Sequence, residues 1–193
     1  MTRYLLLSFV SLLSLVVSGQ DLYSFQDSHG KFGLKDQNDK VIVAPRYDKI
    51  GNFQEGMAAV NIGGAEEERY ENTFMGGLWG YINAAGKEVI PVQYTDTHEF
   101  SEGLAPVEQN GKWGYIDKTG KTLIPFQYEG AYIFGEGLAS VSLANDIWGA
   151  INKKGIMVIK PAYTTLFSFY GGKAQVRIGL DQFKIDKTGK RVK

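Results

Sequence analysis

The sequence predicts an all-β protein built from repeats, and three observations predict it. Four segments share one internal spacing, because each begins with Trp or Phe followed by Gly and ends 28 positions later at Val. Five turns open on Asp or Asn, and four of them close three positions later on Gly. Aromatic residues and glycines are abundant, and helix-length apolar patterns are few. Such fixed spacing is typical of units that stack on their neighbours. The units are 32–60, 79–107, 113–141 and 148–176, followed by a partial cap at 177–193.

Each unit opens with a strand that carries the repeat signature. A glycine in mid-strand weakens the strand unless another element packs closely on it. We therefore expect a neighbouring element to lie against this glycine in every unit. Regular spacing favours core packing of the tryptophans over an exposed ladder that stacks on sugars. The signature residues are Phe32, Gly33, Trp79, Gly80, Trp113, Gly114, Trp148 and Gly149.

A turn and a second strand follow the signature. Asp117 to Gly120 fits a type I turn with a left-handed last residue, which joins antiparallel strands. The strand after it, Thr122 to Ile124, is expected to stop at Pro125, because proline lacks the amide hydrogen of a central ladder.

The third strand shows which side chains are buried. Its Ala and Val positions, such as Ala105 and Val107, are the same in all units, whereas the residues between them vary. Since side chains alternate across a strand, the constant positions should face the core and the varied ones solvent or a partner. Each unit is thus predicted to be a three-stranded β-meander. About four and a half meanders of about 35 residues form one domain, 20–193, as an open, solenoid-like array. The alternative is a small closed ring resembling a β-propeller.

Residues 1–19 are predicted to be a signal peptide. Arg3 precedes an apolar run from Tyr4 to Val17, and small residues lead to Gly19, where we expect cleavage. The run falls short of the roughly 20 residues that span a bilayer. We expect export to the periplasm or the extracellular space, without stable membrane insertion of the mature chain. The absence of cysteine excludes disulfides, thiolate metal sites and a lipid-bearing cysteine.

Charge and motifs argue against several functions. The 21 basic and 21 acidic residues balance, so no nucleic-acid partner is expected. His29 and His98 lack ligands at metal spacing, and no nucleophile motif or phosphate-binding loop is present. We therefore predict no enzymatic activity and no catalytic, cofactor-binding or metal residues. Glu55, Glu102 and Glu136 stand at equivalent places in their units, whereas a catalytic pair needs two different environments.

The chain resembles the WG-repeat family, also called KWG repeats. The resemblance rests on Gly111 to Lys121, on Leu123 to Pro125 and on Glu136 to Ala139, and it extends over about residues 30–190. It implies a β-rich repeat protein of a kind common in bacteria and often exported, with no enzymatic activity assigned to the repeat. The pattern is broken at Leu34 and Lys35 and again at Gln182 and Phe183, so the terminal units are expected to be caps.

The best candidate for individual function is an insertion at 61–78. Insertions in repeat proteins collect in loops on one face, which is often the binding face. A solvated charged loop is the alternative interpretation. We expect a non-enzymatic extracytoplasmic binding or scaffold module that contacts protein or cell-envelope glycan. The alternative is a hydrolase of envelope polysaccharide that uses Glu102 and Glu136. The candidate binding residues are Glu66, Glu67, Glu68 and Tyr70 in the insertion, and Tyr81, Tyr115, Tyr132, Phe167 and Tyr170 elsewhere.

Overall fold

The computed structural model describes residues 22–66, 74–144 and 146–193. The predicted signal peptide lies outside these residues, as do three candidate binding residues, Glu67, Glu68 and Tyr70. The described residues form eighteen β-strands. No helix in this part of the chain is long and apolar enough to cross a membrane.

The strands form five antiparallel sheets, named A to E in chain order. Sheet A contains β1 (Tyr23–Gln26), β2 (Phe32–Lys35) and β3 (Val41–Tyr47). Sheet B contains β4 (Lys49–Ile50), β5 (Met57–Glu66), β6 (Phe74–Asn83) and β7 (Glu88–Tyr94). Sheet C contains β8 (Asp96–Thr97), β9 (Leu104–Gln109), β10 (Lys112–Asp117) and β11 (Thr122–Tyr128). Sheet D contains β12 (Gly130–Ala131), β13 (Leu138–Ser142), β14 (Trp148–Asn152) and β15 (Met157–Tyr163). Sheet E contains β16 (Lys173–Ile178), β17 (Asp181–Asp186) and β18 (Arg191–Val192).

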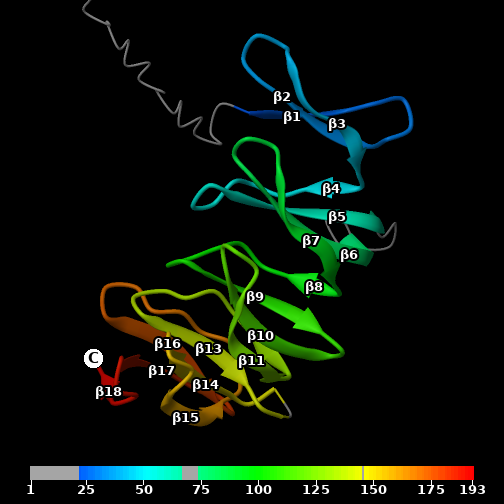
Figure 1. Ribbon diagram of the computed structural model, residues 1–193. Helices are drawn as coiled ribbons and strands as arrows, with labels where there is room; N and C mark the ends of the chain where they lie inside the picture. The colour runs from blue at the N-terminus through cyan, green and yellow to red at the C-terminus, as the bar shows by residue number, and fades with distance from the viewer. Residues whose placement is uncertain (1–21, 67–73, 145) are drawn as a thin grey trace, which may run out of the picture.

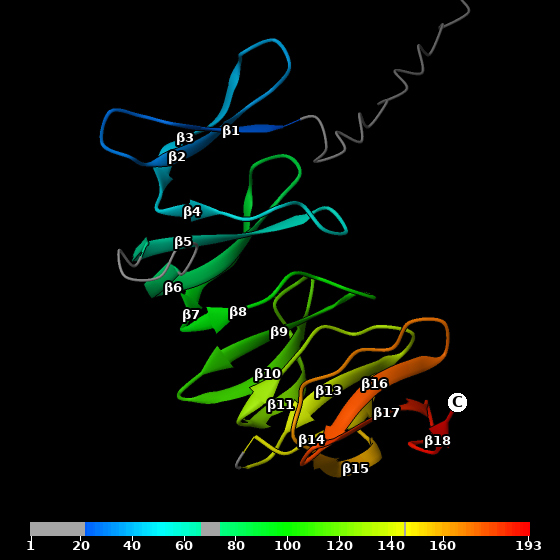
Figure 2. The same cartoon turned by 180° about the vertical axis from the view of Figure 1, so that it is seen from behind.

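The sheets follow one another in a curved row. Sheet A lies at one end of the molecule and sheets D and E at the other, in both views (Figures 1 and 2). Each junction between consecutive sheets holds its own cluster of buried apolar side chains. The predicted all-β, open array of repeats is thereby confirmed.

The sheets do not coincide with the sequence units. Strand β9, which closes one unit, pairs along its full length with β10, which opens the next. A two-residue turn at Asn110 and Gly111 joins them, with φ of 54° and 73°. Turns with two positive φ angles match the twist of paired strands, so they fold the two strands into a hairpin. Sheets B, C and D therefore take strands from two units. Their fourth strands, β4, β8 and β12, have two residues each and follow Tyr47, Tyr94 and Tyr128.

The second strand runs through its proline, contrary to the prediction that it stops there. β11 extends to Tyr128, and it bulges between Ile124 and Tyr128, opposite Gly114. Because residues in a bulge leave the ladder, the missing amide hydrogen of Pro125 costs no ladder bond. A Cβ on Gly114 would lie 2.8 Å from the Ile124 carbonyl oxygen. The element expected to pack on the signature glycine is this bulged backbone, and the other units repeat it at Gly33, Gly80 and Gly149.

Both faces of the interior sheets are buried. In sheet C, Ala105 and Val107 pack in the cluster shared with sheet B, as predicted for the constant positions. The varied position Leu104 packs in the cluster shared with sheet D, so the prediction that varied positions face solvent or a partner is wrong for interior sheets. The reason is that the sheets stack face to face. Only in sheet E are these positions exposed, at Lys173 and Gln175.

The two end sheets carry polar side chains where interior sheets carry apolar ones. An isoleucine that is fully buried in sheets B to E is replaced by Lys35 in sheet A. On the outer face of sheet E, Lys184 takes the place of the buried Tyr115 of sheet C. These substitutions agree with the expected caps. The buried isoleucines are Ile82, Ile116, Ile151 and Ile185.

Candidate functional site

One glutamate braces each of the three junctions from B to E. The Glu102 carboxylate accepts a hydrogen bond from the Gly137 amide at 3.0 Å and pairs with Lys153 at 3.0 Å. Glu55 binds the Gly103 amide and Lys118 in the same way, and Glu136 binds the Gly172 amide and Lys187. These glutamates hold consecutive sheets together in three equivalent environments.

The braces also set the protonation of their carboxylates. Hydrogen bonds, led by that from the Gly172 amide, lower the pKa of Glu136. Burial raises the pKa of Glu55, but hydrogen bonds from Lys118 and the Gly103 amide outweigh it and leave the pKa lowered. Both groups are therefore favoured as carboxylates, the form that accepts these hydrogen bonds and pairs with lysine.

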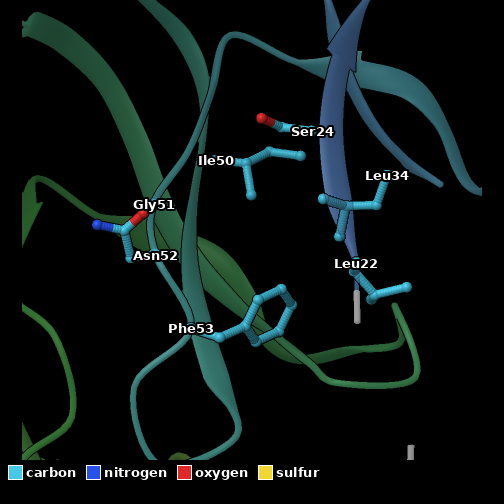
Figure 3. A pocket seen from close by; sticks show the side chains of 7 residues that line it. All are labelled: Leu22, Ser24, Leu34, Ile50, Gly51, Asn52 and Phe53. Carbon is cyan, nitrogen blue, oxygen red and sulfur yellow. The ribbon is translucent and has the colours of Figure 1, made fainter. Parts of the chain in front are cut away.

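The junction between sheets A and B is built differently. Ala84 stands where the bracing lysines stand in later sheets, so this position supplies no ammonium group to pair with a carboxylate of sheet A. Three hollows of about 200, 200 and 290 Å³ lie along this junction. The first, which we name the A–B pocket, is lined by Leu22, Ser24, Leu34, Ile50, Gly51, Asn52 and Phe53 (Figure 3).

The predicted insertion is an extension of a hairpin in its described part. Strands β5 and β6 remain paired as far as Glu66 and Phe74, although a loop was expected there. Gly63 and Gly77 have positive φ and are left out of the ladder, which keeps its register, and a Cβ on Gly77 would collide with the Gly64 amide nitrogen. The glycines at 63–64 and 76–77 therefore allow the hairpin to continue to Glu66 and Phe74.

Two polar side chains fix the extension. The buried Asn61 amide group donates to the Gly76 carbonyl at 3.1 Å and accepts from the Gly64 amide at 3.0 Å. Asp48 accepts a hydrogen bond from the Gly63 amide at 2.7 Å and forms an ion pair with Lys31 of sheet A. Burial raises the pKa of Asp48, but the hydrogen bonds from Lys31 and Gly63 outweigh it and lower the pKa overall.

The extension and sheet A together enclose the hollow of about 290 Å³, which we name the hairpin hollow. Two rings, Phe32 and Phe74, belong to its wall, and Phe74 packs edge-on against Trp79 at 5.7 Å. The ammonium group of Lys49 lies 4.8 Å from the centre of the Phe74 ring. The polar lining consists of Gln26, Asp48 and Glu66. Rings beside carboxylates and an amide can contact an apolar face and bind hydroxyl or amide groups at once.

The structure separates the candidate binding residues that were predicted. Glu66 lines the hairpin hollow. Tyr81 and Tyr115 are 0 % exposed and Phe167 is 4 % exposed, so the prediction that they make surface contacts is wrong. Their rings fill the junctions between sheets. These junctions could not be inferred from the sequence units, because each sheet combines strands of two units. Tyr132 is half-buried beside His98, and Tyr170 is 92 % exposed at the start of sheet E.

The tryptophans lie where core packing predicts. Trp113 is buried, and Trp79 and Trp148 are half-buried against the clusters between sheets. Sequence reasoning did not select Phe32, Asp48 or Phe74 as lining residues. The sequence could have indicated Asp48. Lys31 and Asp48 occupy the same repeat positions as Lys112 and Glu129, and both pairs form ion pairs.

Comparisons with known proteins support the fold and identify the repeats. The structure resembles that of a eukaryotic initiation factor, with a TM-score of 0.55 and 11% identity over 91% of this chain and 52% of that chain. It also resembles Hsv2 of Kluyveromyces lactis, with a TM-score of 0.53 and 12% identity over 91% of this chain and 60% of that chain. This chain spans about half to three-fifths of those structures, and the likeness shows the fold alone.

A comparison with curated proteins gave no match. The model of the family described as WG containing repeat matches residues 32–64, 79–113, 113–145 and 148–179. These matches cover more than half of the chain and agree with the four units. The chain therefore belongs to the family of WG containing repeat proteins.

Proposed function

We propose that this protein is a non-enzymatic binding or scaffold module that acts outside the cytoplasm and contacts protein or cell-envelope glycan through the hairpin hollow. One observation carries the proposal: the insertion that distinguishes one junction is held in place by Asp48 and walls a hollow lined with rings and polar groups. The predicted signal peptide supports the location. Binding sites are typically concave, with apolar walls and a few polar groups that fix orientation.

The rest of the array supports a scaffold role. Junctions B–C, C–D and D–E are closed by braces and by buried rings, so they hold the sheets in a fixed relation. Glu102 and Glu136, the acids that a hydrolase would need, take equivalent structural positions there. Because both glutamates already bind a glycine amide and a lysine, we assign them a structural role and propose no catalysis.

The test compares binding by variants of the hollow. Phe74→Ala removes one ring from its wall, and replacing residues 62–78 by an Asn-Gly turn removes the extension. Leu123→Ala is the matched control, because it truncates an exposed apolar side chain of sheet C. Each protein is immobilised and offered purified cell-wall polysaccharide and, separately, envelope proteins, after circular dichroism has shown that it is folded.

We expect the parent chain and Leu123→Ala to retain the same ligand, and both variants of the hollow to lose it. Equal retention by all four proteins would show that the hollow is not the binding site. No retention by the parent chain from either source would count against a binding module. Cell fractionation tests the location, and recovery in the cytoplasm would refute it.

A further inference from the structure

Each junction has two positions that can supply a ring to its centre. In junction B–C the first is Tyr81, whose ring packs on Phe100 with centroids 4.8 Å apart. In junction C–D it is Tyr115, which packs on Phe134 at 5.0 Å. The second position lies four residues after Tyr94, Tyr128 and Tyr163, and it holds His98, Tyr132 and Phe167. The His98 ring packs on Trp113 and Tyr132, so the ring at the centre of B–C is that of Tyr81. Both junctions are therefore filled by rings.

In junction D–E the first position has no ring, and the second position supplies one. Its first position is Ala150, but Phe167 at the second position packs on Phe169 at 5.9 Å. Junction A–B has Leu34 at the first position and Gly51 at the second, so neither position carries a ring. The A–B pocket lies between these two residues and Phe53, which is the equivalent of Phe100.

The pocket combines apolar side chains with polar groups, which include Ser24, Asn52 and the backbone of Gly51. The side chains of Leu34, Ile50 and Phe53 point into the same space, and Leu22 completes the apolar part of the lining (Figure 3). Its volume is about 200 Å³. A protein cavity of roughly 150 Å³ admits benzene, so the volume of the pocket is sufficient for a single ring. Phe53 is half-buried, whereas Phe100 and Phe134 are 2 % and 1 % exposed beneath their tyrosines.

A polar group marks one side of the pocket. In junctions B–C, C–D and D–E, the backbone carbonyl of the second position accepts a hydrogen bond from a hydroxyl. Tyr81 donates to the His98 carbonyl at 2.6 Å, Tyr115 donates to the Tyr132 carbonyl at 2.8 Å, and Ser140 donates to the Phe167 carbonyl. The corresponding carbonyl in junction A–B belongs to Gly51, and the position of Leu34 supplies no hydroxyl there. Ser24, which pairs with Leu34 as Ser140 pairs with Ala150, is the hydroxyl in the lining of this pocket.

We infer that the A–B pocket binds a phenol ring, which packs on Phe53 and donates its hydroxyl to the Gly51 carbonyl. The bound ring takes the place that Tyr81 and Tyr115 fill in the next two junctions. The ligand is a small phenolic molecule or a tyrosine side chain of a partner. The inference deepens the proposed function by assigning a ligand class to the same junction, but it uses a different hollow.

The test measures binding of p-cresol to the full chain by calorimetry and ligand-observed NMR. Toluene is the matched ligand without the hydroxyl, and it should bind at least about tenfold more weakly, because a site that binds a hydroxyl rejects the analogue lacking it. Leu34→Tyr places the missing ring inside the pocket and should abolish p-cresol binding. Gly51→Phe places a ring at the second position, as Phe167 does in junction D–E, and a Cβ there meets only contacts of 3.5 Å or more, so this variant should also abolish p-cresol binding.

N-acetyltyrosinamide distinguishes the two sources of the ring. Binding of this compound as well as p-cresol indicates a tyrosine of a partner protein, and binding of p-cresol alone indicates a small phenol. Phe74→Ala should leave p-cresol binding unchanged, so loss of the hairpin hollow and loss of the pocket can be told apart. The inference fails if p-cresol does not bind, if toluene binds equally well, or if the folded Leu34→Tyr and Gly51→Phe variants retain p-cresol.

Discussion

Tyr115→Phe removes one hydroxyl from the closed junction between sheets C and D. The Tyr115 side chain is fully buried, and its hydroxyl donates to the Tyr132 carbonyl at 2.8 Å. A hydrogen bond of this kind contributes a net ~0.5–1.5 kcal/mol, and a buried acceptor left without a donor costs ~1–3 kcal/mol. Because Tyr132 is half-buried, we place the loss in the free energy of unfolding at about 1–2 kcal/mol.

Urea denaturation measures this loss, with fluorescence and circular dichroism followed together. The midpoint should fall while the dependence on denaturant stays unchanged, because the variant exposes the same surface on unfolding. In a chain of this length, a loss of 1 kcal/mol lowers Tm by about 2–4 °C. Tyr170→Phe is the control, since its side chain is 92 % exposed, and it should change the free energy by less than about 0.5 kcal/mol. Equal effects of the two substitutions would refute the role given to the buried hydroxyl.

Three further predictions concern pH and close packing. Burial beside Trp113 lowers the pKa of His98 from 6.5 in the folded protein. As the pH falls below 6.5, the unfolded chain therefore binds the proton before the folded protein does. The free energy of unfolding is therefore largest, as far as His98 is concerned, above pH 6.5 and decreases below it. His98→Phe should flatten this decline in urea titrations between about pH 7.5 and about pH 5.5, and an equally steep decline would contradict the prediction. The Gly172 amide lowers the pKa of Glu136 from 4.5, so the brace stabilises the fold above pH 4.5 and loses this effect as the pH falls through the lower, folded-state pKa. Glu136→Gln should unfold more easily at neutral pH and show a smaller acid-induced loss, whereas an unchanged acid profile would exclude the brace as its source. Gly114→Ala should destabilise the protein by about 1–3 kcal/mol in urea, because its Cβ would lie 2.8 Å from the Ile124 carbonyl. Gly51→Ala has room for a Cβ and serves as the control, so similar losses would refute the steric explanation.

The repeat spacing predicted the strands and part of the core. Ala105 and Val107 could be assigned to the core because period-two alternation needs only the local sequence. The partner of each strand could not be assigned from the frame, since pairing of β9 with β10 depends on the turn at Asn110 and Gly111. An Asn-Gly pair between two strands is a hairpin signal, and it lies outside the 28-position frame.

Only one part of the candidate site could be predicted from the sequence, namely the insertion, because its length differs from that of the other junctions. The insertion drew attention to Glu66, which lines the hairpin hollow. Phe32 belongs to sheet A and meets this hollow only because sheet A stacks beside the extension. Tyr81 and Tyr115 vary between units, yet they are buried, because each fills a junction whose opposite wall differs from unit to unit. A repeat position can therefore vary because its neighbour in the core has changed, and such variation does not by itself indicate an exposed surface.

The lysines on the end faces determine where this chain can be lengthened. A copy of residues 113–147 inserted after residue 147 would present to its neighbours the same apolar surfaces that sheets C and D already share. A unit appended after Lys193 would instead bury Lys173 and Lys184 in its first junction, where unpaired charges are costly. Closing the row into a ring would set the same lysines against Lys35. The number of repeats in this lineage is thus expected to change by internal duplication, with the terminal sheets retained as they are.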